Sequence, residues 1–353
     1  MDNPFGRKYQ LWIAPSRDLV RVSEVDKNIA AEIVVTSEDF NSGKILFKDA
    51  VDWLSVPLAE LDDDHPVDTL VISKLHMVAK ATYGKGKSGS MDQNFTIDLY
   101  NLPSSDLARI QDESLVILKA GYETDSSLPL ICSGQLIHSY TERSGNDMIT
   151  YLVCKDSYVP IKDKRLSLSF APGKFTYRQI LQELLNQAKK LGIASGVINI
   201  PRVSAETLIT LRLNREASQG YVVEGSLFES IKALCEQVGL VSYIQLNTLY
   251  VEPKSHHPRE LLDITTVNKD SVVGIVSPLN NSTTSGVGSK KAPNGVKFKT
   301  FLNGRIVLAN YVQVITGQED PPLYEPTKIT HTLDYEGTSW FTGVEAMELS
   351  NAE

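Results

Sequence analysis

The chain has 353 residues, a net charge of −8 and a hydrophobic content of 42%. This length exceeds one ordinary hydrophobic core and predicts two to four modules. The acidic balance argues against a general nucleic-acid-binding protein, because such proteins need a basic stripe to neutralise phosphates. The N-terminus carries no apolar signal segment, and no run reaches about 18 apolar residues. We therefore expect a protein that is made in the cytosol and does not cross a membrane by helices.

Residues 1–65 predict a strand-rich N-terminal extension. Period-2 patterns favour strands at 10–14, 29–36 and 44–48, whereas 50–54 fits a short helix or a short strand. The run Asp62, Asp63, Asp64, His65 first suggests a metal cluster. Consecutive carboxylates on a loop point in different directions, and calcium-loop spacing is absent. We interpret this run as a solvated linker.

Residues 66–160 predict a first small β-barrel. In the stretch 94–100, apolar and polar side chains alternate, and Pro103 ends the predicted strand. Ser104 or Ser105 can then cap a short helical turn. Further strand patterns occur at 70–75, 77–83, 115–119, 130–140 and 148–155, with a hairpin turn at 144–147. Closing these strands into an antiparallel barrel would remove exposed sheet edges.

Residues 161–255 predict an α/β insert with two amphipathic helices. The stretch 176–179 has the form of a capping box, and Gly192 is expected to end the first helix. A second capping box begins at Ser226, and Gly239 is expected to end that helix. Buried packing explains the apolar stripe of each helix, and a hairpin that turns near residue 246 follows them.

Residues 256–353 predict a second β-barrel. Strand patterns occur at 272–277, 296–301, 311–315, 328–333 and 340–349. The stretch 279–295 is rich in Ser, Thr, Gly and Asn, which is typical of a long mobile loop.

Few residues offer chemistry. Three cysteines lie in apolar patterns without CxxC spacing, and we interpret them as buried hydrophobic side chains: Cys132, Cys154 and Cys235. His256 and His257 cannot both bind one ion from a strand, so a surface loop is expected there. The glycine-rich loop 84–90 lacks the G-x-x-x-x-G-K-[ST] spacing of a phosphate loop and is predicted to be a hairpin tip. No catalytic, cofactor-binding or metal-binding residue is predicted.

One series of motifs resembles a known family. The run IDLYNL, a short acidic connection, VILKAGYE and then ICSGQLIHS resembles the first barrel of phage central baseplate hub proteins. A second run of these proteins, H-x-x-D-x-x-G-x-x-W-x-T, is matched in order by His331, Asp334, Gly337, Trp340 and Thr342. Upstream of this run, Gly304 stands where these proteins usually have a proline. His331, Asp334 and Trp340 could suggest a site, but we interpret Trp340 as a core aromatic and His331 as a strand residue.

The resemblance covers about residues 66–353 and implies a fold. That fold is mainly β with an α+β insert, and its two small antiparallel β-barrels are related by pseudo-duplication. The insert is a small α/β module with two helices. The implied role is structural and not enzymatic, in a homotrimeric, pseudo-sixfold ring that joins a central spike to the tail tube.

The implied partners follow from that role. They are other copies of the chain, the central spike protein, and the first tube ring or a tube initiator, with tape-measure and wedge proteins as further candidates. Sequence-specific nucleic acid is not among them, and no cofactor is implied. The implied location is the tail baseplate of the virion, after assembly in the host cytoplasm.

Alternatives from other functional classes stay open. A peptidoglycan hydrolase needs only two carboxylates, and the chain has 43. Against it, no H-E-x-x-H, G-x-S-x-G or Cys/His family spacing occurs. A tail-associated peptidoglycan-binding protein could instead use the two capped helices of the insert.

Overall fold

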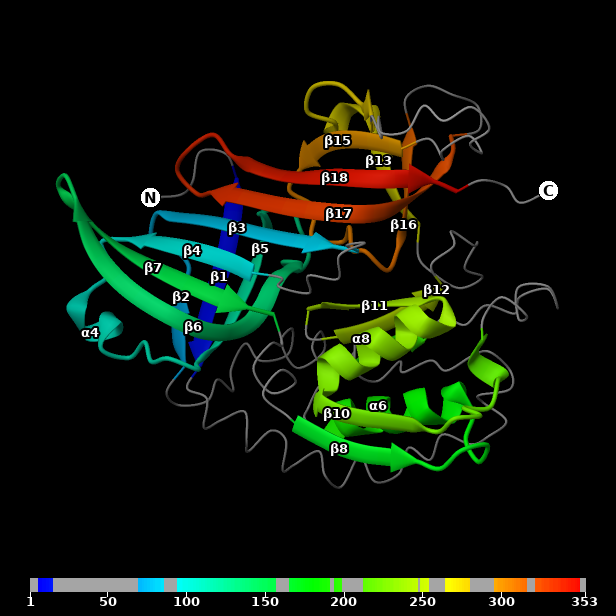
Figure 1. Cartoon of the computed structure of the whole chain (residues 1–353). Coiled ribbons are helices and arrows are strands. Elements are labelled where there is room, and N and C mark those ends of the chain that lie inside the picture. The colour runs from blue at the N-terminus through cyan, green and yellow to red at the C-terminus, as the bar shows by residue number, and fades with distance from the viewer. Residues whose placement is uncertain are drawn as a thin grey trace.

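The computed structural model describes residues 6–14, 69–85, 94–156, 165–190, 194–198, 212–246, 248–253, 264–279, 295–315 and 321–349 (Figure 1). Several sequence predictions therefore lie outside the described residues. They are the strands at 29–36 and 44–48, the segment 50–54, the run 62–65, Gly192, the histidines at 256–257 and most of the loops 84–90 and 279–295.

The described chain is mainly β, with three α-helices in the residues that the structure describes. Thirteen strands form one sheet, of which eleven follow the order β14-β15-β18-β17-β3-β4-β7-β6-β5-β1-β2. β13 pairs with β16, and β16 in turn pairs with β17. The strands are β1 Arg7–Ala14, β2 Leu70–Ile72, β3 Met77–Gly84, β4 Asn94–Tyr100, β5 Leu115–Tyr122, β6 Leu130–Ser144, β7 Asp147–Lys155, β13 Ile264–Asn268, β14 Ser277–Pro278, β15 Gly295–Phe301, β16 Tyr311–Ile315, β17 Leu323–Asp334 and β18 Trp340–Glu348.

Two closed barrels are not confirmed, because the two predicted barrel regions share one open sheet. β17 pairs antiparallel with β3, from Lys328 opposite Gly84 to Asp334 opposite Val78. In a separate closed barrel, both edges of every strand pair within that barrel. Here β3 and β17 each use one edge to pair with a strand of the other region. Figure 1 shows β17 and β18 lying alongside β3 and β4 as one surface. The pseudo-duplication of two barrels is likewise not confirmed.

The N-terminal strand is part of this sheet. β1 pairs with β5 over its full length, from Arg7 opposite Tyr122 to Ala14 opposite Leu115. Its other edge pairs with β2. The strand predicted at 10–14 is therefore confirmed and begins three residues earlier.

One of the predicted C-terminal strands is wrong in extent. Residues 272–277 form only a single bridge, at Val272 with Thr300, and the short β14. A 3-10 helix, η2 Lys269–Ser271, precedes them. Gly274 has φ +87°, which breaks an extended path between the bridge and β14.

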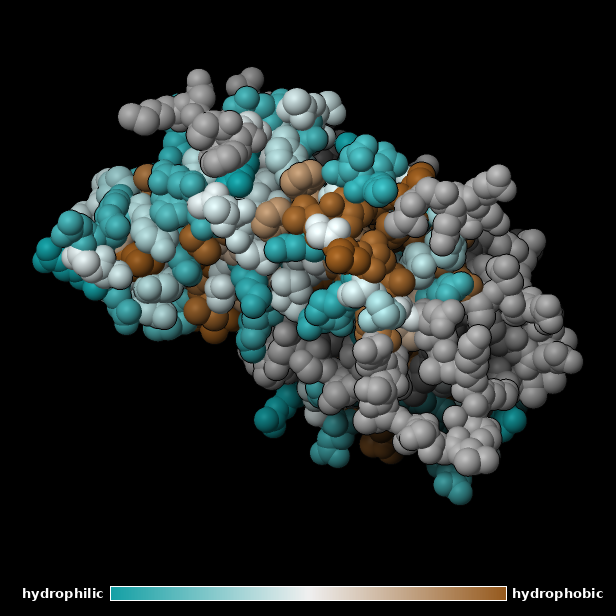
Figure 2. All heavy atoms as spheres, turned by 90° about the horizontal axis from the view of Figure 1, so that it is seen from above, coloured by the Kyte–Doolittle hydropathy of each residue, from teal (hydrophilic) through white to brown (hydrophobic). Residues whose placement is uncertain are grey.

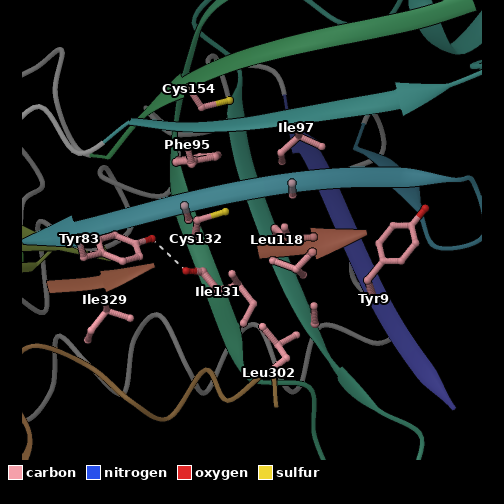
Figure 3. Packing of buried hydrophobic residues seen from close by; sticks show 14 of the residues in the cluster. Tyr9, Tyr83, Phe95, Ile97, Leu118, Ile131, Cys132, Cys154, Leu302 and Ile329 are labelled. Atoms are coloured by element: carbon pink, nitrogen blue, oxygen red, sulfur yellow. Dashed lines mark hydrogen bonds between the residues drawn. The ribbon is translucent and has the colours of Figure 1, made fainter. Parts of the chain in front are cut away.

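A single hydrophobic cluster packs against the main sheet and draws on both halves of the chain. Leu118 and Ile131 come from the first half, and Leu302 and Ile329 from the second (Figure 3). The hydroxyl of Tyr83 donates a hydrogen bond to the Ile131 carbonyl at 2.9 Å, which satisfies a fully buried phenol. The two halves therefore fold around a shared core.

The insert has its own core, formed by two helices against short strands. Its elements are β8 Arg165–Phe170, α6 Tyr177–Lys190, β9 Ala194–Ile198, η1 Arg212–Asn214, β10 Tyr221–Ser226, α8 Leu227–Val238, β11 Leu240–Gln245 and β12 Thr248–Pro253. β8 pairs with β10, and β12 lies between β11 and β9. A separate short helix, α4 Ser104–Leu107, follows β4 in the main sheet.

The helix caps of the insert differ from each other. At α6 the predicted capping box is confirmed, because the amide of Gln179 donates to Thr176 Oγ1 and the amide of Thr176 donates to Gln179 Oε1. The box predicted at Ser226 is wrong, since its side chain makes no cap hydrogen bond. Ser226 is also the last residue of β10, and its pairing with Arg165 fixes its orientation. Gly239 ends α8 in the left-handed conformation, as predicted.

The insert is anchored to the main sheet through the end of β11. The amide of Leu308 donates to Gln245 Oε1 at 2.8 Å, and the amide of Leu246 donates to Asp156 Oδ2 at 2.6 Å. Beside them, Lys85 Nζ and Glu325 Oε1 form an ion pair at 2.7 Å. Their side chains are only 8% and 9% exposed. The ammonium also lies 5.0 Å from the Tyr243 ring centroid, so this pair joins β3, β17 and the insert.

We predict that breaking this buried pair destabilises the fold more than removing both partners. Lys85→Met or Glu325→Leu alone leaves an uncompensated charge and should lower the free energy of unfolding by about 3 to 5 kcal/mol. The double variant should lose less than either single variant, because it leaves neither buried charge without the other. Urea unfolding of the four proteins measures this coupling. Strictly additive losses would contradict a direct interaction.

Candidate functional site

The residues that first suggested a site near the C-terminus do not converge. His331 and Trp340 are buried in the main core. Nδ1 of His331 is hydrogen-bonded to Oγ1 of Thr342 at 3.0 Å. Asp334 instead lies in the β17–β18 turn, where its Oδ1 accepts from the amide of Gly337 at 2.8 Å. This arrangement supports the interpretation of Trp340 as a core aromatic.

A polar cluster holds the β17–β18 turn against the N-terminal strand. Arg7 Nη1 donates to the carbonyls of Asp334 at 2.8 Å and Gly337 at 2.7 Å, and its guanidinium lies 5.5 Å from the Trp340 ring centroid. Nε2 of His76 lies 3.0 Å from Asp334 Oδ1. Burial lowers the pKa of Arg7, and the nearby Tyr122 and Asp334 oppose that shift. The cluster is a structural clamp, and sequence spacing gave no signal of it because Arg7 lies far from the turn in the chain.

All three cysteines are buried and none forms a disulfide, in agreement with their interpretation as hydrophobic side chains. Burial raises the pKa of the Cys132 and Cys154 thiols, which keeps them protonated. In the described ranges, no group of three or more His, Cys, Asp or Glu side chains could hold a metal ion. No helix in the described part of the chain is long and apolar enough to span a membrane.

The outer side of the C-terminal half carries a surface that we call the lysine-rich face. Cross-strand pairing places its members in two rows across β15, β18, β17 and β3. One row is Lys297, Glu345 and Lys328, and the other is Phe301, Phe341, Thr332 and Lys80. Together with Lys299, which lies between the rows, the face carries four lysines and one carboxylate. Its net charge is therefore +3, whereas the whole chain has a net charge of −8. Pleating explains this, since alternate residues of each strand point outward.

A hollow of about 310 Å³ lies in the lysine-rich face. Gly343 leaves its floor open, and Ile275, Lys299 and Phe341 stand around it. Lys299 Nζ lies 4.1 Å from the Phe341 ring centroid, and Lys297 Nζ lies 3.3 Å from Glu345 Oε1. Figure 2 looks down on this end of the molecule and shows hydrophobic residues gathered beside hydrophilic ones. The surface is suited to binding an apolar, acidic partner.

A projecting hairpin at the other end of the molecule is a second candidate surface, which we call the arm, residues 140–148. β6 and β7 pair to its tip, where Ser144 lies opposite Asp147 (Figure 1). Tyr140 stacks on Tyr151 with ring centroids 4.8 Å apart. Asn101 joins the arm to the α4 connection through two hydrogen bonds. Its side-chain Nδ2 donates to Asp147 Oδ1 at 2.9 Å, and its backbone amide donates to the Met148 carbonyl at 2.7 Å.

Neither the lysine-rich face nor the arm was predicted as a site. Lys297 and Lys299 are neighbours on β15, but Lys328 joins them only through the β15–β18–β17 pairing and Lys80 only through the β3–β17 register. The arm could have been found from sequence, since its hairpin signal was present and the strand patterns on both sides of it were long.

No protein-family model and no curated protein matches the chain. Among solved structures, the 43 kDa tail protein of prophage MuSo2 from Shewanella oneidensis is similar at 10% identity and a TM-score of 0.48, covering 78% of this chain and 93% of that protein. A tail protein from Neisseria meningitidis is similar at 8% identity and a TM-score of 0.48, covering 79% of this chain and 94% of its own.

A third similar structure is an E. coli component of the type VI secretion system, described as structurally similar to the bacteriophage T4 tail proteins gp27 and gp5. It shares 12% identity at a TM-score of 0.49, covering 79% of this chain and 75% of its own.

We predict that His331 makes stability depend on pH. Burial lowers its pKa to about 4, from about 6.5 in the unfolded chain. Its contribution is therefore complete above about pH 6.5 and is lost as the pH falls toward 4, by up to about 3 kcal/mol. Unfolding free energies measured from pH 7 to 4 should fall less steeply for His331→Asn. An unchanged slope for His331→Asn would contradict the assignment.

Proposed function

We propose that this protein is a structural hub of a phage tail baseplate. Three copies form a pseudo-sixfold ring that joins the central spike to the tail tube. Its partners are other copies of itself, the spike protein and the first tube ring or a tube initiator. The role is binding and not catalysis, and the protein resides in the tail of the virion.

The observation that carries this proposal is the single sheet running through both halves of the chain. A sheet shared by two halves with a common core is a rigid plate, which suits a protein that transmits load between a spike and a tube. In the described residues the strand path ends at β2 and β14, so both ends offer backbone groups to a neighbouring chain. The motif resemblance at 94–140 and 331–342 supports the same class independently.

We further propose that the two halves of the main sheet act as twin barrel-like units. Residues 66–160 and 256–353 each take the place of one barrel in the ring, with the insert at 161–255 on its outside and the extension at 1–65 before them. A neighbouring chain continues the sheet at each edge, so three chains supply six barrel-like units around the axis. Obligate interfaces of this kind bury more than about 2,000 Å².

We predict a solution mass of three times the chain mass of 39.0 kDa. Light scattering coupled to size exclusion, with the protein alone and with the candidate spike protein, measures it. A chain that stays monomeric over the accessible concentrations and assembles with no tail component would remove the proposal.

The competing class is a peptidoglycan hydrolase or a peptidoglycan-binding protein. We expect no lysis on a zymogram with cell-wall substrate and no retention on purified peptidoglycan. Clear lysis would assign an enzyme, and retention that is lost on altering the insert would assign a wall-binding module.

A further inference from the structure

We propose that the lysine-rich face of one copy binds the arm and the α4 connection of a second copy of this chain. The inference rests on the self-association proposed above and adds to its sheet edges two further surfaces that contact each other between copies.

The lysine-rich face has the exposure of a protein-binding surface. Ile275 is 86% exposed and Phe301 is 49% exposed, beside the hollow at Gly343. Large apolar side chains gathered around a hollow and rimmed by charges mark interaction sites. The lysines alone would also suit a phosphate backbone, but an exposed isoleucine contributes little to binding nucleic acid. A protein partner fits the face better.

The arm has the complementary chemistry. Within 101–114 and 140–148, five carboxylates oppose two arginines, a net charge of −3. The carboxylates are Asp106, Asp112, Glu113, Glu142 and Asp147. Tyr140 and Met148 are 42% and 45% exposed, so the arm also carries apolar side chains of a size that suits the hollow. Asn101 fixes the two acidic segments to each other, as its hydrogen bonds to Asp147 and Met148 show.

Geometry favours a second copy over the arm's own chain. In Figure 1 the arm projects from one end of the molecule, whereas β15 lies toward the other end. Four strands, β18, β17, β3 and β4, separate β15 from the hairpin in the sheet order. The contact is therefore heterologous, with different surfaces on each partner, and such a contact closes into a ring when its rotation allows. The complementary charges make it sensitive to salt.

A charge-reversal series tests the proposal. Lys299→Glu with Lys328→Glu should weaken self-association by at least about tenfold in dissociation constant, because two attractive contacts become repulsive. Adding Asp112→Lys and Glu142→Lys should restore much of the loss. Lys8→Glu, at an exposed lysine of β1 outside both surfaces, is the matched control and should leave association unchanged. Sedimentation velocity at two salt concentrations measures all four proteins.

Cysteine cross-linking gives a second readout. The native thiols are buried, so Met148→Cys with Ile275→Cys should form disulfide-linked dimers and trimers on oxidation. Met148→Cys with Val222→Cys is the control, since Val222 is 70% exposed but lies in the insert. The control should remain monomeric on a non-reducing gel.

The outcomes separate this inference from the hub proposal. The inference is wrong if the wild type forms a trimer, the lysine reversals do not weaken it and Met148→Cys with Ile275→Cys forms no cross-link. That result would leave the hub proposal standing. A wild-type chain that never associates with itself or with a tail component removes both. Lysine reversals that abolish binding to an oligo-dT probe while the trimer persists would reassign the face to nucleic acid.

Discussion

The pairing of β3 with β17 is the constraint on which the rest of the structure depends. It joins strands from the two ends of the described chain into one ladder, and the Lys85–Glu325 pair at its end links residues 240 positions apart. Closing so long a loop is entropically unfavourable, but the cost grows only slowly with length and the shared core offsets it. Without this ladder, each half would expose an open edge and part of its core.

The same register determines both sides of the plate. On β17, Ile329, His331 and Leu333 point into the core, whereas Lys328, Thr330 and Thr332 point outward. A shift of one residue would bury the lysine and expose the core residues, so packing fixes the register strongly. The lysine-rich face and its hollow follow from this alternation, because the outward residues of four strands together form them.

Sequence reasoning predicted the elements well and their partners poorly. Alternation marked β3, β4 and β7, a capping box marked the start of α6 and a terminal glycine marked the end of α8, because these signals are local. The period of a strand says which face is buried but not which strand lies beside it, so two barrels were expected where β3 pairs with β17. Arg7 could not be placed for the same reason, since only the folded chain brings it to the β17–β18 turn. The lysine-rich face was equally out of reach, because strand pairing brings Lys328 and Lys80 beside the lysines of β15.

Native-state hydrogen exchange, followed by mass spectrometry, tests the joined sheet most directly. Peptides covering Met77–Gly84 and Leu323–Asp334 should exchange only through global unfolding, with the same free energy and the same response to denaturant. Exchange of the two strands through separate openings of different free energy would show that the halves fold independently, and the account of one plate with one core would be wrong.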